Sequence, residues 1–181
     1  MTTILALAGS LRRASYNRGL QRAAIEASGA DFEVIGGHID EVPLYNGDLE
    51  AEFGLPAPVR RLQEQLAAAD GLLLISPEYN GGLPGVLKNA VDWMSRGEGL
   101  RAFRDKPAAV IGASEGSFGT VLGQAQWAQI FRKLGMAPWY GRQLMVTTAA
   151  QRFDAEGNLT DDEIRKRLHD YLAAFAHHLA R

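Results

Sequence analysis

Short apolar runs alternate along this chain with longer segments in which apolar residues recur every three or four positions. This alternation constrains the fold more than any other feature, because strand-length apolar runs separated by amphipathic helices are typical of a parallel sheet covered on both faces. Four of the five runs are largely apolar, and the second, which is weaker, could lie nearer an edge. The expected strands are Thr3–Ala8, Phe32–Ile35, Gly71–Ile75, Ala108–Ile111 and Gln143–Thr147.

Five helices are predicted from the spacing of their apolar residues. Their stripes are Leu20, Ala23, Ala24 and Ala27; Val59, Leu62 and Leu66; Leu87, Ala90, Val91 and Met94; Trp127, Ile130, Phe131 and Leu134; and Ile164, Leu168, Tyr171, Leu172, Phe175 and Leu179. Gly29 is expected to end the first helix as a C-cap, and Gly135 follows the fourth helix. Pro84 suits the first turn of the third helix. Thr160 and Glu163 form a capping box in front of the last helix.

Five strands and five helices in strict alternation leave few topologies, because crossover connections between parallel strands are right-handed. We predict an α/β fold with a doubly wound five-stranded parallel sheet in the order 2-1-3-4-5 and helices on both faces. The chain shows no repeat, low-complexity tract or linker, so residues 1–181 are expected to form a single domain. Ligands of such sheets bind outside the carboxyl ends of the strands. The candidate site therefore lies in the loops after the first, third and fourth strands.

The composition excludes several classes of protein. The chain contains no cysteine, which rules out disulfides, thiolate catalysis and cysteine-ligated metals. Its net charge of −2 argues against a nucleic-acid partner, because neutralising phosphates needs a basic face. None of the four histidines has the spacing of a helical metal-ligand pair, and we predict no metal site.

The N-terminal apolar run, Ile4–Ala8, is about as long as one strand, and no basic residue precedes it. A secretory signal has a longer apolar region and a charged start. No stretch approaches the roughly 20 apolar residues of a membrane-spanning helix. We therefore expect a cytoplasmic protein without a membrane partner.

The loop after the first strand, Gly9–Asn17, opens the first helix, and we call it loop one. Its small and hydroxyl residues allow main-chain N–H groups to face an anion, and the helix N-terminus adds a positive dipole. Ser10, Ser15 and Asn17 can donate further hydrogen bonds, and Arg12 supplies a charge. This combination suits a terminal phosphate, although loop one has neither a G-x-G-x-x-G nor a GK[ST] motif. The alternative is that Ser15 or Asn17 only caps the helix.

The loop after the third strand, Ser76–Gly85, contains two prolines and three glycines in ten residues, and we call it loop two. These residues fix an unusual backbone path. A flat heteroaromatic ring needs a rigid wall with main-chain donors and acceptors at its polar edge. Tyr79 could supply the wall, and the amides around Asn80 and Gly81 could supply the edge contacts.

The loop after the fourth strand, Ala113–Thr120, is called loop three. Gly116 and Gly119 permit the backbone to approach a ring or its side chain closely. Taken by itself, this segment is only a glycine-containing turn ahead of a helix, and a purely structural role is favoured.

Together the three loops resemble the NAD(P)H-dependent FMN reductase family, which has a flavodoxin-like fold and includes quinone, chromate and azo-compound reductases. The matching stretches are GSLRRASYN, PEYNGGLPGVLKNAVDWMS, SEGSFGT followed by Ala125-Gln126, and VPLYNGDLE after the second strand. The resemblance runs over nearly the whole chain in the right order, and the second stretch is the most specific. Thr120 stands where many relatives carry a second glycine.

The resemblance implies which residues hold the FMN cofactor. Loop one would hold the phosphate, the PEYNG segment would line the isoalloxazine ring, and loop three would flank the same cofactor. The implied cofactor-binding residues are Ser10, Arg12, Ser15, Tyr16, Asn17, Pro77, Glu78, Tyr79, Asn80, Gly81, Ser114, Gly116 and Ser117. The cofactor carries the chemistry, so no catalytic side chain is expected. Glu78 is given a structural or orienting role, because hydride transfer needs no side-chain base.

The resemblance also implies an activity. Such an enzyme takes electrons from NADPH or NADH and passes two of them, by a ping-pong mechanism, to a quinone, chromate, an azo compound or free flavin. The alternative is a flavodoxin-type electron carrier that does not oxidise NAD(P)H efficiently, which the near-neutral charge and the arginine of loop one disfavour. A scaffold that has lost its flavin is a third hypothesis, and the intact first two loops argue against it.

Members of this family are typically homodimers or homotetramers with flavin sites near the subunit interfaces, which implies the same here. The helix predicted over Val86–Arg96 carries Trp93 off its buried stripe, where a large aromatic side chain could meet a partner. The Leu44–Leu55 segment is predicted to be an irregular loop rich in large apolar residues, and it is the second candidate for an interface. The alternative is that Trp93 and Phe53 pack against their own domain.

Overall fold

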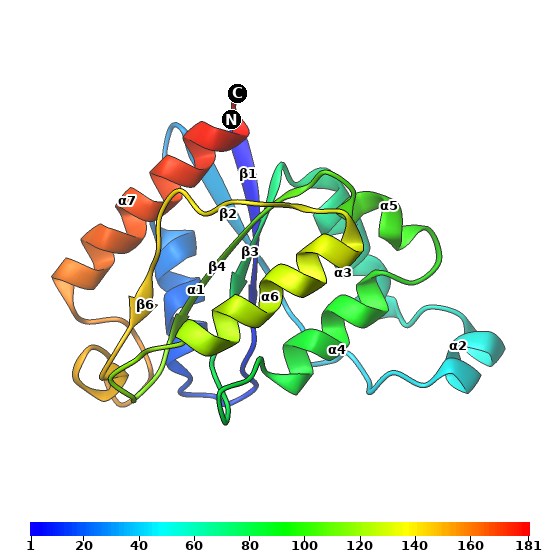
Figure 1. Cartoon of the computed structure of the whole chain (residues 1–181), viewed down its shortest axis with the longest axis horizontal. Helices are drawn as coiled ribbons and strands as arrows, with labels where there is room; N and C mark the ends of the chain where they lie inside the picture. Colours follow the sequence, from blue (N-terminus) through cyan, green and yellow to red (C-terminus); the bar gives the residue numbers. More distant parts are fainter.

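The computed structural model describes residues 1–181. Its main strands are β1 (Thr2–Ala8), β2 (Phe32–Gly37), β3 (Gly71–Ile75) and β4 (Pro107–Ala113), which confirms the first four predicted strands. They pair in parallel in the order β2-β1-β3-β4-β5, which is the predicted flavodoxin-like arrangement (Figure 1). The second strand does lie at an edge of the sheet.

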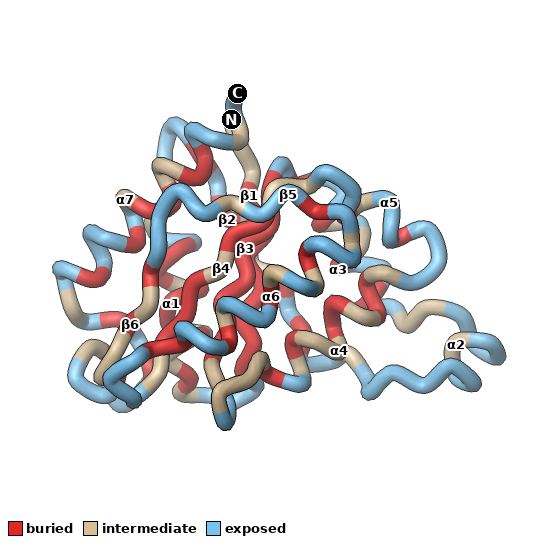
Figure 2. Tube along the Cα trace, in the orientation of Figure 1, coloured by how far each residue is buried: buried red, intermediate tan, exposed pale blue.

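Helices cover both faces of this sheet. The longer ones are α1 (Tyr16–Glu26), α3 (Ala57–Ala68), α4 (Gly85–Met94), α6 (Val121–Leu134) and α7 (Asp162–Leu179). One apolar layer joins α1 and α7 to the sheet, and a second joins α3, α4 and α6 to its other face. The strands between these layers are the most deeply buried part of the chain (Figure 2). None of the helices is both long and apolar enough to cross a lipid bilayer.

The predicted helix ends are partly correct. Gly135 ends α6 in a left-handed conformation, with φ of 70°, as expected of a C-cap glycine. Gly29 was expected to cap α1, but that helix ends two residues earlier at Ala27. Thr160 was expected to cap α7, but the N-cap is Asp161, whose carboxylate accepts a hydrogen bond from the N–H of Ile164. An aspartate is as good an N-cap as a threonine, so the two adjacent candidates could not be separated by type alone.

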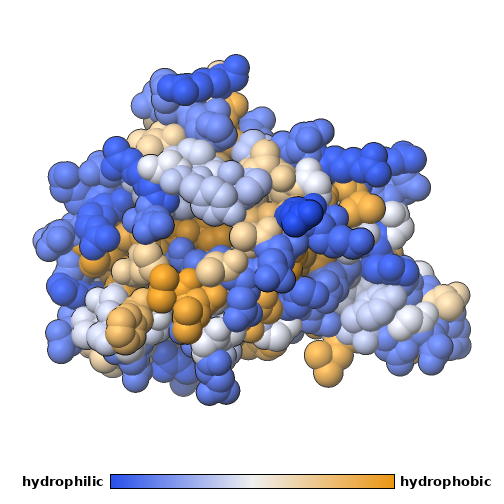
Figure 3. All heavy atoms as spheres, in the orientation of Figure 1, coloured by the Kyte–Doolittle hydropathy of each residue, from blue (hydrophilic) through white to orange (hydrophobic).

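The predicted fifth strand, Gln143–Thr147, is present only as the short strand β6 (Met145–Val146). A second short strand that was not predicted, β5 (Ala137–Pro138), lies before it, and both pair in parallel with β4. Between them the chain leaves the edge of the sheet, and Trp139 packs against the rings of Tyr171 and Phe175 on α7. An apolar cleft of about 200 Å³ opens there beside α6, and Figure 3 shows apolar surface over this part of the molecule.

Two short helices and two 3₁₀ turns lie where loops were expected. They are α2 (Gly47–Phe53), α5 (Leu100–Phe103), η1 (Gly97–Gly99) and η2 (Ala149–Gln151). The α2 helix falls within the segment predicted to be irregular, and the side chain of Asn46 caps it by accepting from the N–H of Asp48 at 2.9 Å. No residue of α2 is buried, and the helix projects from the body of the protein (Figures 1 and 2). We call residues 43–55 the arm.

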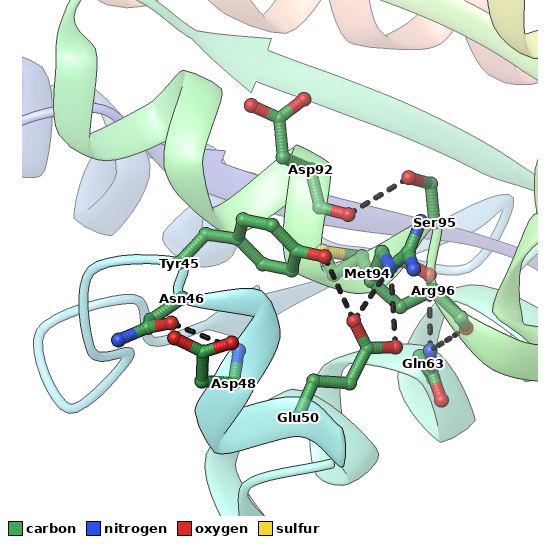
Figure 4. A network of polar contacts seen from close by, with 9 residues as sticks. All are labelled: Tyr45, Asn46, Asp48, Glu50, Gln63, Asp92, Met94, Ser95 and Arg96. Carbon is green, nitrogen blue, oxygen red and sulfur yellow. Dashed lines mark hydrogen bonds and ion pairs between the residues drawn. The ribbon is translucent and has the colours of Figure 1, made fainter. Parts of the chain in front are cut away.

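Polar contacts, rather than an apolar core, attach the arm to α4. Figure 4 shows the carboxylate of Glu50 between the Tyr45 hydroxyl, which donates at 2.9 Å, and the Nε of Arg96, which donates at 2.9 and 3.1 Å. The Arg96 guanidinium also lies 5.5 Å from the centre of the Tyr45 ring. The hydrogen bond from Tyr45, together with Arg96, holds the pKa of Glu50 below its ordinary value. The network therefore persists at neutral pH, where this carboxyl is ionised.

Trp93 lies beneath the arm and is completely buried within its own chain. Its ring meets Tyr45 edge-on at 4.9 Å between centroids, and its indole N–H donates to the Pro43 carbonyl at 2.9 Å. The argument that Trp93 needs a partner subunit is therefore wrong, because the arm covers its outer face. Phe53, by contrast, is 71% exposed and does not pack into its own domain.

We expect Trp93→Ala to lower the free energy of unfolding by about 3–5 kcal/mol, because it removes a large buried aromatic ring and leaves a cavity. Urea unfolding of the flavin-free protein measures this loss. Tyr140→Ala, which removes an exposed aromatic ring outside the arm, should change the free energy of unfolding by no more than about 0.5 kcal/mol. Equal losses in the two variants would mean that the arm does not cover Trp93 in solution.

Candidate functional site

The three predicted loops meet at one edge of the sheet. They follow β1, β3 and β4, whose carboxyl ends all point toward the lower edge of the molecule in Figure 1. The Gly9 N–H donates to the Ile75 carbonyl at 2.8 Å, and the Ser76 N–H donates to the Ile111 carbonyl at 2.8 Å. Because the starts of the loops are tied together in this way, each loop begins at a fixed place relative to its neighbours.

Several main-chain N–H groups of loop one have no hydrogen-bond partner within the chain. The five N–H groups from Ser10 to Ala14 make no hydrogen bond within the chain. Ser15 caps α1 by accepting from the Arg18 N–H at 3.3 Å, so the positive end of the helix dipole lies beside these donors. The Ser10 side chain is nearly buried at the same place. A run of free N–H groups at a helix N-terminus has the character of an anion-binding loop.

Arg12 is exposed, and its guanidinium lies over the ring of Tyr16, 4.9 Å from the ring centre. No carboxylate is paired with it. The Tyr16 hydroxyl donates to the Glu115 carboxylate at 3.3 Å, which links loop one to loop three. Arg12 is thus a cation without a counter-ion, and stacking on Tyr16 restricts where it can reach.

Asn17 joins two loops instead of pointing freely into the site. Its side-chain amide donates to the Ala113 carbonyl at 2.9 Å and accepts from the Ala113 N–H at 2.9 Å. The side chain is 4% exposed. A contact of Asn17 with a phosphate stays a prediction, and in the structure the side chain bonds to Ala113. Both hydrogen bonds of this side chain go to the main chain at the end of β4, so that the N–H and the carbonyl of Ala113 are satisfied by Asn17.

Loop two is a rigid hairpin. The N–H and carbonyl of Tyr79 exchange hydrogen bonds with those of Gly82, at 3.0 and 2.9 Å. Asn80 and Gly81 between them have φ of 52° and 72°, the left-handed values of a type I′ turn. Tyr79 is 54% exposed beside this turn, so its ring is available as a wall.

Loops one and two are in close contact at Gly9. A Cβ atom on Gly9 would lie 2.9 Å from side-chain carbons of both Leu87 and Pro84, and 3.0 Å from Pro77. Only glycine allows this approach without displacing loop two. The main chain of loop one at Gly9 therefore packs directly against the buried Pro77 of loop two.

Loop two is also held by α6. The Glu78 carboxylate accepts from the Gly123 N–H at 2.9 Å, in the first turn of that helix, which agrees with the structural role expected of it. Gln126 donates to the Gly81 carbonyl at 2.8 Å and accepts from the Leu83 N–H at 3.4 Å. Sequence reasoning missed this role of Gln126. The Ala125-Gln126 pair among the stretches that match the family was the available signal.

Loop three is open where it was expected to approach the cofactor. Gly116 and Ser117 are exposed, and the Gly116 N–H donates to the Ser114 hydroxyl oxygen at 3.1 Å. Thr120 points the other way and is completely buried, with its hydroxyl accepting from Gln124 at 2.9 Å. The side chain of Thr120 therefore fills the interior.

The family of this chain follows from comparison with known proteins. The family model described as NADPH-dependent FMN reductase matches residues 2–151. The chain belongs to this family.

Relatives of known name agree with the assignment. The chain is 41% identical over 171 residues to an NAD(P)H-dependent FMN reductase of Pseudomonas aeruginosa, covering 94% of this chain and 91% of the relative. It is 36% identical over 173 residues to a 2-hydroxy-1,4-benzoquinone reductase of a Burkholderia species, covering 96% and 93%. As an FMN reductase family member, the chain is an oxidoreductase that uses FMN and takes electrons from NAD(P)H.

Solved structures support the fold. The flavoenzyme NAD(P)H:(acceptor) oxidoreductase FerB of Paracoccus denitrificans superimposes with a TM-score of 0.86 at 33% identity, covering 99% of this chain and 98% of FerB. A flavodoxin of Pseudomonas aeruginosa superimposes with a TM-score of 0.56 at 20% identity and covers all of both chains, which shows the shared fold alone.

The loops of this FMN reductase fit a flavin mononucleotide. Loop one offers free N–H donors and an unpaired arginine, which suit a phosphate. Loop two offers a hairpin with a left-handed turn at Asn80 and Gly81, beside the exposed ring of Tyr79. Loop three adds an exposed hydroxyl and a glycine with space around it, where a Cβ would meet only the Ser114 hydroxyl at 3.5 Å.

Proposed function

We propose that residues 1–181 act as one flavin-binding domain, an NAD(P)H:quinone oxidoreductase with its FMN at the carboxyl edge of the sheet. The observation that carries this proposal is the free main-chain donors of loop one beside the rigid hairpin of loop two. The first suits a phosphate and the second an aromatic ring, and together they match a mononucleotide rather than an isolated anion.

The proposed contacts divide by loop. Loop one would bind the phosphate through its main-chain N–H groups, Arg12 and the hydroxyls of Ser10 and Ser15. Loop two would wall the ring and contact its polar edge, and loop three would flank it. The residues proposed to line the cofactor are Ser10, Arg12, Ser15, Tyr16, Pro77, Tyr79, Asn80, Gly81, Ser114, Gly116 and Ser117, with Asn17 and Glu78 holding the loops in place.

When bound, FMN supplies the two-electron chemistry, and the protein has to orient it and leave one face open. Quinones are the acceptor class favoured by the relatives, several of which are named quinone reductases. Chromate, azo compounds and free flavin are further candidate acceptors, since each needs only to reach the exposed ring. The alternative, an electron carrier without direct NAD(P)H oxidation, has the support of the fold alone.

We expect turnover to follow a ping-pong scheme, because donor and acceptor would use the same open face in turn. Initial rates measured while NADPH and a benzoquinone are both varied should give parallel double-reciprocal lines. Intersecting lines would indicate a ternary complex and a second binding site. Failure of NADPH and NADH alike to reduce the bound flavin in a stopped-flow experiment would favour the carrier instead.

We expect Arg12→Ala to weaken FMN binding by about ten- to a hundredfold, the usual contribution of a hydrogen bond to a charged group. Titration of the flavin-free protein with FMN, followed by the quenching of flavin fluorescence, measures the dissociation constant. Arg13→Ala is the matched control, because Arg13 is the neighbouring exposed arginine and is likewise unpaired. Equal effects of the two substitutions would mean that Arg12 acts only through general charge.

We also propose a homo-oligomer, a dimer or tetramer, with the arm at a subunit contact. Leu44 and Phe53 are 80% and 71% exposed on a segment that is nonetheless fixed to α4 by the Glu50 network. Ordered apolar side chains without cover are typical of an interface.

Light scattering at micromolar concentration should give a mass at least twice that of the 19.7 kDa chain. Replacing both Leu44 and Phe53 by serine should lower that mass, because the apolar contact is lost while the fold keeps its core. A monomeric wild-type protein would contradict the oligomer, and an unchanged mass for the double variant would contradict the arm as its contact.

A further inference from the structure

A turn near the C-terminus packs directly against loop one. Residues 153–159 follow β6 and η2, outside the 2–151 stretch that the family model matches. Phe153 and Leu159 form an antiparallel bridge at the base of the turn, and both are buried in the same apolar layer as α1 and α7. Figure 1 shows this orange segment returning to the same lower edge of the molecule as the blue loop after β1. We call residues 153–159 the C-terminal turn.

The contact between the C-terminal turn and loop one is main chain against main chain. Gly157 is buried with φ of 78°, and a Cβ there would lie 2.7 Å from the carbonyl carbon of Ala14 and 2.8 Å from its oxygen. A Cβ on Gly19, in the first turns of α1, would overlap the Gly157 carbonyl oxygen. The turn therefore sits against both the last part of loop one and the start of the helix, with no room for a side chain.

Polar contacts fix the turn in this position. Arg22 of α1 donates to the Gly157 carbonyl at 2.9 Å and to the side-chain oxygen of Asn158 at 2.8 and 3.1 Å. Asn158 donates to the Asp154 carboxylate through its main-chain N–H at 2.7 Å and its side-chain amide at 3.0 Å. These hydrogen bonds, the main-chain one first, hold the pKa of Asp154 below its ordinary value. The turn is thus closed by its own aspartate and fastened to α1.

An aromatic contact adds to the same junction. The ring of Phe153, which is buried at the base of the turn, lies 5.1 Å from the ring of Tyr16, and the Arg12 guanidinium lies over that same Tyr16 ring. The turn therefore touches loop one at Ala14, Tyr16 and the first turns of the helix. None of its own residues belongs to the proposed cofactor contacts.

We propose that the C-terminal turn is a positioning device for the phosphate-binding loop, with Gly157 and Asn158 as its positioning residues. The inference rests on the proposed FMN site. Gly157 packs against the carbonyl of Ala14, which lies in the same peptide plane as the Ser15 N–H. Holding this peptide plane in place therefore also holds the junction between loop one and α1. The free N–H groups from Ser10 to Ala14 are then held for an anion before it binds, which lowers the entropy lost on binding.

The proposal predicts that disturbing the turn weakens recognition of the phosphate and leaves recognition of the ring intact. The quantity to measure is the ratio of the dissociation constants of riboflavin and FMN for the flavin-free protein, because riboflavin lacks the phosphate. In Gly157→Ala, we expect FMN to bind at least about tenfold more weakly and riboflavin to change by less than about twofold. Asn158→Ala, which leaves the net charge unchanged and adds no steric overlap, should lower the ratio by about threefold or more.

Gly135→Ala is the matched control for backbone strain. Gly135 has φ of 70°, close to that of Gly157, but ends α6 far from loop one along the chain, and its added Cβ would meet only an Arg104 carbon at 3.9 Å. This variant should lose stability and keep the wild-type ratio. Thermal unfolding of each variant separates lost stability from lost affinity.

The outcomes separate this inference from the function on which it rests. A wild-type ratio near one would overturn the phosphate site of loop one, and the role of the turn with it. A large wild-type ratio that both variants retain would overturn the role of the turn alone. If Gly157→Ala does not fold, the ratio in Asn158→Ala decides, and equal weakening of FMN and riboflavin in that variant would show a merely structural role.

Discussion

The rest of the structure depends on the burial of β1 and β3 on both faces. From Ile4 to Leu7 and from Leu72 to Ile75, no residue is exposed to solvent. Parallel strands buried in this way need helices on both sides, and each crossover returns the chain to the same edge of the sheet. Three loops are therefore brought together at the carboxyl edge before any residue in them makes a specific contact.

The loops are then fixed by contacts that join one to another. Asn17 satisfies both polar groups of Ala113, which ties loop one to the end of β4. Glu78 and Gln126 tie loop two to α6. Because these side chains hold the loops, the main-chain donors of loop one are left free. Preorganised main-chain donors of this kind bind an anion at little cost in conformational entropy.

The arm and the C-terminal turn show two ways of fixing a segment that has little core of its own. The arm is held by an ion pair and hydrogen bonds at its inner side and leaves its apolar side chains outward. The C-terminal turn combines buried ends, an internal aspartate and a glycine in direct contact with loop one. The arm leaves apolar side chains exposed to solvent, whereas the C-terminal turn packs against loop one and holds its main chain in place.

The sequence by itself determined the strand order, the two apolar layers and the family, because periodicity and the loop motifs are local properties of the chain. It also placed the candidate site at the correct edge, since strand order decides where the loops meet. It could not show that the side chain of Asn17 would hydrogen bond to the main chain of Ala113, or that the arm would cover Trp93. Nor could it show that the edge beside β4 would hold two short strands, with Trp139 between them packed against α7. Each of these is a contact between residues more than thirty positions apart, and only the packed tertiary structure decides which of several suitable partners a side chain meets.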